Sequence, residues 1–151
     1  MQYNGLTYFP MALLSHKGLL AIAAVMDVAL YGHGRPVSAK VLAVRHALPA
    51  RHLEPVLQAL VRDGILKSIR GPRGGYELAR DRQRITADDI LRAAGTIEIN
   101  AMPVLAGSAL VKEVVMPAVS QAERAFSSAL SRINIDDLVR RAEPFKDMLG
   151  V

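Results

Sequence analysis

A change in the period of the apolar residues within residues 49–78 constrains the fold more than any other feature of the chain. The first half of this stretch carries an apolar stripe at the i, i+3, i+4, i+7, i+8 spacing of one helix face, formed by Leu53, Val56, Leu57, Leu60 and Val61. Gly64 follows, where a glycine can adopt the left-handed backbone that ends a helix. From Ile65 the period is 2, and a glycine-rich tip at 71–75 precedes a return strand at 76–78. The pattern predicts an amphipathic helix followed by a β-hairpin.

A shorter helix is expected immediately before this unit. Ser38 can cap a helix that runs to about His46, and its expected inward residues are Val41, Leu42 and Val44. Residues 47–49 then form a short connection. Such a helix pair could be a simple αα-hairpin, but the polar first turn of its second helix, the hairpin directly after it and the surrounding Arg and Lys residues favour a winged helix-turn-helix.

Two further helices are expected to support this unit. The first begins at the N-cap Ser15 and ends near Gly32. The second begins at Thr86, where Asp88 and Asp89 complement the helix dipole, and it ends at Gly95. The predicted DNA-binding domain therefore spans residues 11–95.

The C-terminal third is expected to assemble the protein. Residues 96–116 read as a connector and possible sensor loop, and residues 117–151 as a long helix followed by a final helix that begins at Asn134. The long helix has an extensive apolar side made of Val119, Ala122, Phe126, Ala129, Leu130 and Ile133. This side could pack on a second copy or fold back onto its own domain. We favour the second copy, because a helix-turn-helix usually binds two half-sites. The predicted fold class is mainly α with a small β-hairpin wing.

Charge and composition narrow the range of functions. The net charge of +5 arises entirely in residues 1–100, with 13 Lys/Arg against 8 Asp/Glu, whereas residues 101–151 hold 6 of each. This asymmetry favours a polyanion-binding domain joined to an assembly domain, although an ordinary solvated basic surface would look similar. The longest apolar run, 19–30, is too short to cross a bilayer and no targeting pattern is present, so a cytoplasmic protein without membrane contact is expected.

Several stretches together resemble a family of bacterial winged-helix regulators that includes the iron–sulfur regulator IscR, the nitric-oxide regulator NsrR and the cysteine regulator CymR. They are SHKG, PVSAKVLA, HLEPVLQALVRDGILKSIRGPRGGYELAR, ITADDILRA and INIDDLV, which extend over about residues 13–140. The resemblance implies a homodimer on a palindromic operator in double-stranded DNA, usually repressing transcription, with C-terminal helices that cross between subunits.

The same resemblance suggests which residues meet DNA. The first turn of the recognition helix would read base edges through Arg51, His52 and Glu54, with Gln58 one turn further on; Glu54 could instead pair with Arg51 or Gln58 within the helix. In the wing, Gly71, Gly74 and Gly75 would allow close approach to the backbone while Arg70 and Arg73 supply cations. Lys40 and Lys67 are expected to contact phosphates. Ser38 could orient a phosphate or simply cap its helix.

The chain departs from the cluster-binding relatives in one definite way. Those relatives carry three cysteines before the dimer helix, whereas this sequence contains no cysteine, and its four histidines lack metal-ligand spacing. We therefore expect no cofactor and no metal; an effector, if one exists, would be an apolar small molecule or a partner protein at residues 96–116. No catalytic constellation predicts an enzyme. The alternatives to a specific regulator are a protein-interaction module that senses a metabolic enzyme and an architectural DNA binder of low specificity.

Overall fold

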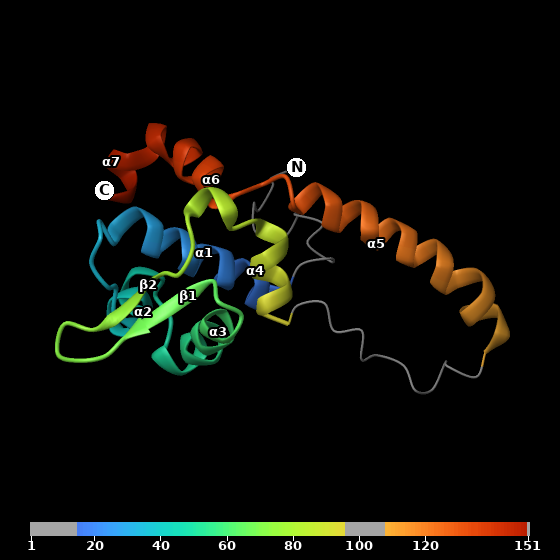
Figure 1. The fold of residues 1–151 in the computed structure, drawn as a ribbon, viewed down its shortest axis with the longest axis horizontal. Coiled ribbons are helices and arrows are strands. Elements are labelled where there is room, and N and C mark those ends of the chain that lie inside the picture. Colours follow the sequence, from blue (N-terminus) through green and yellow to red (C-terminus); the bar gives the residue numbers. More distant parts are fainter. Residues whose placement is uncertain (1–14, 96–107, 151) are drawn as a thin grey trace, which may run out of the picture.

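The structure, a computed structural model, describes residues 15–95 and 108–150. Figure 1 shows a helical head from which one long helix extends. The head contains α1 (His16–Tyr31), α2 (Ala39–Arg45), α3 (Ala50–Arg62), the hairpin strands β1 (Leu66–Ile69) and β2 (Gly75–Leu78), the 3₁₀ turn η2 (Arg82–Arg84) and α4 (Ala87–Ala93). The C-terminal part contains the π-helical segment η3 (Val111–Val115), α5 (Met116–Leu130), α6 (Ile135–Ala142), η4 (Glu143–Phe145) and α7 (Lys146–Leu149). The mainly α fold with a hairpin wing is confirmed.

The predicted helix starts are confirmed by capping hydrogen bonds. Ser15 Oγ accepts from the backbone N–H of Gly18, and Ser38 Oγ accepts from that of Val41, both at 3.2 Å. Thr86 and Asn134 each form a reciprocal capping box with the aspartate three residues later. Because each cap satisfies backbone donors that a helix leaves free, these local sequence signals locate α1, α2, α4 and α6 correctly.

One core joins the elements of the head. The apolar faces of α1, α3 and α4 meet there, and the predicted stripe of α3 supplies four fully or almost fully buried side chains, Leu53, Val56, Leu57 and Leu60. The sequence predicted three inward-facing residues on α2, and this prediction is wrong for two of them. Leu42 is buried, but Val41 and Val44 are 43% and 74% exposed. The second residue that α2 turns inward is Ala43, whose small side chain lets α2 approach α3.

The C-terminal elements differ in whether they pack against the head. α6 packs back against α1 and η2, and Ile135 is completely buried in the head core. η3 and α5, by contrast, leave the head as one continuous arm that touches it only at the C-terminal end of α5 (Figure 1). Of the predicted connector 96–116, residues 96–107 lie outside the described residues, and η3 already belongs to the arm. None of the described helices combines the length and apolarity that a membrane crossing requires.

Candidate nucleic-acid interface

The end of α3 and the start of the wing are fixed by backbone hydrogen bonds. The N–H of Gly64 donates to the carbonyl of Val61, and the N–H of Ile65 donates to the carbonyl of Leu60. This is the Schellman pattern, and it uses the left-handed conformation of Gly64, whose φ is +73°. Ile65 is almost fully buried. The hairpin therefore begins immediately after α3 with a fixed direction relative to it.

The four predicted base-reading side chains all lie on the solvent side of α3. Arg51, His52, Glu54 and Gln58 are exposed. Within residues 15–95 and 108–150, none of these four side chains takes part in an ion pair or a hydrogen bond. Glu54 therefore does not form the intrahelical pair considered as the alternative. A row of polar groups without protein partners on an exposed helix face is available for base edges.

The positions of the wing glycines require glycine for different structural reasons. A Cβ at Gly74 would lie 2.2 Å from the carbonyl oxygen of Ile69, and a Cβ at Gly75 would lie 2.5 Å from the carbonyl group of Val37. Gly75 sits beside the backbone bridge between Val37 and Tyr76 that ties the wing to the loop before α2. Glycine is thus required here by contacts within the protein. Gly71, with φ +114° and open space around it, needs glycine for its backbone conformation alone.

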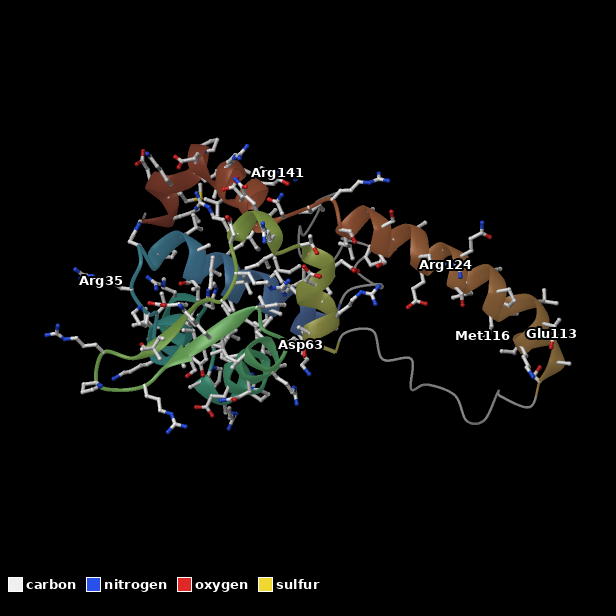
Figure 2. The ribbon with its side chains drawn as sticks, viewed as in Figure 1. Arg35, Asp63, Glu113, Met116, Arg124 and Arg141 are labelled. Atoms are coloured by element: carbon white, nitrogen blue, oxygen red, sulfur yellow. The ribbon has the colours of Figure 1, made fainter. Side chains whose placement is uncertain are left out.

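A wide groove separates the wing tip from the start of α2. It has a volume of about 980 Å³, and its lining includes Arg35, Ser38, Val41 and Arg73. Arg35 projects into solvent from the α1–α2 loop, on the side of the molecule where the hairpin tip lies (Figure 2). Sequence reasoning missed Arg35 as a DNA-contacting candidate, because only the fold brings this loop beside the wing. The groove has the cationic walls that a sugar–phosphate strand requires.

The basic residues of this region divide into free and paired groups. Arg70, Arg73, Arg35 and Lys40 are exposed and form no ion pair with the described residues. Lys67, predicted to contact phosphate, pairs across the hairpin with Glu77 at 3.4 Å. Ser38 uses its hydroxyl as a helix cap.

Two other arginines that follow the wing in the sequence bond to groups of the protein itself. Arg80 bonds the carbonyl of Gly64 and lies 3.7 Å from Asp89, and Arg82 pairs with Asp136 at 2.9 Å. Arg51, Arg62 and Arg84 are also exposed and form no ion pair with the described residues, so the unpaired cations of this region lie at the wing tip, around the start of α2, on α3 and on η2.

The predicted dimer residues also divide into two groups. Leu130 is buried against Ala87 and Leu91 of α4, and Phe126 and Ile133 pack against the same cluster. Val119, Ala122 and Ala129 are exposed. Nearer the start of the arm, Leu110, Val114, Val115 and Met116 add large exposed apolar side chains. Met116 is labelled in Figure 2, far from the head.

A polar network holds the end of α5 on α4. Ser127 Oγ donates to Asp88 Oδ1 at 2.7 Å and accepts from Arg92 at 2.8 Å, while Arg92 Nε donates to Asp88 Oδ2 at 2.8 Å. The hydrogen bond to Asp88 raises the pKa of Arg92 above its ordinary value. Together with the Leu130 cluster, this network fixes the direction in which the arm leaves the head.

Comparison with known proteins places this architecture in a family. A family model described as "Iron-dependent Transcriptional regulator" and named Rrf2 matches residues 14–141. The chain belongs to the Rrf2 family. Solved Rrf2-type structures share its fold: IscR of T. potens (TM-score 0.70, 26% identity, 94% of this chain and 93% of that one) and CymR, the global cysteine regulator of B. subtilis (TM-score 0.64, 28% identity, 85% and 96%).

Curated relatives match over about half of the chain. An HTH-type transcriptional regulator of Haemophilus influenzae is 39% identical over 80 residues, which are 53% of each chain. IscR of Escherichia coli is 34% identical over 80 residues, 53% of this chain and 49% of the relative. The chain thus spans about half the length of the curated relatives it matches. These Rrf2 relatives are transcriptional regulators and not enzymes.

Iron appears in the family description, but the donor set of this Rrf2 chain does not fit a cysteine-ligated cluster. The 151 residues contain no cysteine. The described residues also contain no group of three or more His, Asp or Glu side chains placed to hold a metal ion. Thiolate ligation of iron is therefore chemically impossible for this chain.

Proposed function

We propose that this Rrf2-family regulator binds a palindromic DNA operator specifically, as a homodimer without an iron–sulfur cluster, and represses transcription there. The observation that carries the proposal is the exposed polar row of α3, which has no partner among the described residues, beside a wing tip whose Arg70 and Arg73 form no ion pair with those residues. α3 would read base edges in the major groove while the wing and the start of α2 hold phosphates. The arm would pair two heads so that two half-sites are read together.

Selection of operators from random DNA with the purified protein tests this function. A short palindrome with two equal half-sites supports it. Equal affinity for random duplex would indicate an architectural DNA binder, and absence of DNA binding would indicate a protein-interaction module. Either result would overturn the proposal.

Replacing Arg73 with alanine should weaken operator binding and flatten its salt dependence. Each lost phosphate contact lowers the slope of log K against log salt by roughly 0.9, so a dimer with two wings should lose about 1.8. Arg141→Ala is the matched control, because Arg141 lies on α6, away from the wing (Figure 2). The measurement is fluorescence anisotropy between low and moderate salt. Equal slopes for both variants would place the wing off the DNA.

Glu54→Ala should relax sequence preference at one position per half-site by roughly 1–3 kcal/mol, because its carboxylate can accept a hydrogen bond from cytosine N4. Affinity for random DNA should stay constant or rise, since a negative charge near phosphates is removed. Glu143→Ala, an exposed carboxylate in η4, controls for the change in charge. A uniform loss on every sequence would exclude a base-reading role for Glu54.

A chelator should leave operator binding unchanged, because the chain offers no thiolate for iron. Operator affinity measured on anaerobically purified protein with and without chelator, nitric oxide or mild oxidant checks this. The protein should also lack visible absorbance. Absorbance from bound iron, or loss of binding on chelation, would contradict the expectation.

A further inference from the structure

An open hollow with mainly apolar walls lies between α2 and the start of α3. Lys40 of α2 and Glu54 of α3 both line it. These two side chains are the expected phosphate contact and base contact of the helix-turn-helix, so the hollow belongs to the proposed DNA-binding surface. The other exposed residues of its lining are all apolar, namely Val44, Ala47, Pro49 and Ala50.

The turn residue Ala47 has a backbone conformation that glycine adopts more easily, with a φ of +51°. The N–H of Ala47 donates to the carbonyl of Val44, and the N–H of Leu48 donates to that of Ala43. This is the Schellman pattern, which a glycine, Gly64, completes after α3. The side chain of Ala47 is exposed, so it buries little surface within the chain to offset the strain. Strain that is retained at an exposed residue indicates a function for its side chain.

The C-terminal end of α2 is held in place by a buried carboxylate of α1. Asp27 Oδ2 accepts from Arg45 Nε at 3.0 Å and lies 3.0 Å from His46 Nε2. Arg45 is the last residue of α2, and His46 is its C-cap. Because both residues before the turn are anchored to α1, the geometry of Val44 and Ala47 at the hollow is fixed. A preorganised surface loses little conformational freedom on binding.

The chemistry of the major groove selects what this hollow can contact. Among the groups that the standard bases present there, the C5-methyl group of thymine is the apolar one. The donors and acceptors of the other base edges would be left unpaired against an apolar wall. We propose that the hollow receives a thymine methyl group against Val44 and Ala47, beside the base pair that Glu54 contacts. This inference rests on the proposed function and adds a determinant of sequence specificity to it.

Replacing thymine with uracil tests the contact, because it removes the methyl group and keeps every hydrogen-bonding group of the base pair. In the operator selected from random DNA, each thymine is replaced together with its equivalent in the other half-site, and affinity is measured by fluorescence anisotropy. At one position the replacement should weaken binding at least about tenfold, which corresponds to about fourfold for each buried methyl group. Equal affinity for every uracil-containing operator would overturn the methyl contact and leave the proposed function intact. Failure to select any operator would overturn both.

Two substitutions in the hollow locate the contact. Val44→Ala and Ala47→Gly each remove methyl groups from its wall, and each should reduce the preference for thymine over uracil to less than about twofold per half-site. Val41→Ala is the matched control, because Val41 is also exposed on α2 but lines the groove beside the wing. It should keep the preference of the parent.

The melting temperature separates recognition from folding. Ala47→Gly should leave the melting temperature unchanged or raise it, because glycine relieves the strain of the positive φ. A loss of thymine preference without a loss of stability is not expected of a methyl group that only supports the fold. If Val44→Ala and Ala47→Gly both keep the thymine preference of the parent, the assignment is overturned.

Discussion

The double variant Val115→Glu, Val119→Glu is expected to be a folded monomer of 16.4 kDa that binds its operator roughly 10²–10⁴-fold more weakly than the parent. Val115 and Val119 are 43% and 55% exposed on the projecting arm. Met116, 47% exposed, extends this apolar surface, whereas Val114 lies on the face of the arm that carries Pro117 and Gln121. An exposed apolar patch of this kind, on the part of the arm that projects away from the head, marks an interface. Two glutamates there would be buried against a second copy without counterions, which a dimer does not tolerate.

The loss of operator affinity follows from the loss of the pair. A monomer contacts one half-site, whereas a dimer gains the second contact at high effective concentration. Folding of the head should be unaffected, because neither valine contacts its core. Sedimentation gives the mass, and circular dichroism gives the helix content.

Pro117→Glu, Gln121→Glu is the matched control. These residues are also four apart and exposed, but the 3.6-residue period places them on the other side of the arm. This variant should remain dimeric. A Val115/Val119 variant that sediments as a dimer would show that the arm is not the dimer contact.

The fold changes which residues suit such a test. From sequence, Phe126 and Leu130 belong to one apolar side with Val119. In the fold, Leu130 is buried against α4 of the same chain, and Phe126 packs there too. Replacing them would first release the arm from its own head. An apolar stripe on a helix predicts that this face is buried. It does not predict which part of the face is buried by the same chain and which part by a second copy.

Local signals were sufficient wherever a few adjacent residues determine the structure. The caps at Ser15, Ser38, Thr86 and Asn134 and the left-handed Gly64 depend on hydrogen bonds within one turn. The helix starts and the hairpin were therefore predictable. The expectation for α2 failed because a seven-residue helix has too few positions to define a face, and the small Ala43 lies inward where Val44 was expected.

The candidate site was predictable in part for the same reason. The exposed face of α3 follows from its period, whereas the pairing of Lys67 with Glu77 and of Arg82 with Asp136 depends on contacts between separate elements. The position of Arg35 beside the wing and the burial of Asp27 are likewise products of the tertiary fold. Charge along a sequence shows how many cations exist, and only the fold shows which of them remain free.

The second large effect is expected at the first residue of β2, next to the wing tip, where Gly75→Ala should lower the free energy of unfolding by about 3 kcal/mol, since backbone strain and overpacking each cost roughly 1–3 kcal/mol. The new methyl group would lie 2.5 Å from the carbonyl of Val37, with backbone atoms on both sides of the contact. The φ of +156° adds strain for a residue with a side chain. The bridge between Val37 and Tyr76 must open to relieve the contact, so the wing should also lose its position relative to α2.

Gly71→Ala separates the effect of backbone strain from the effect of the steric contact with Val37. Gly71 also has a positive φ, +114°, but nothing lies near the position of its Cβ. It should therefore cost only about 1 kcal/mol, the strain of the backbone conformation without a clash. Chemical denaturation of both variants measures the difference, and operator binding should fall much further for Gly75→Ala, because only that substitution displaces the whole wing. Equal destabilisation by the two variants would mean that close packing against Val37 does not hold the wing in place.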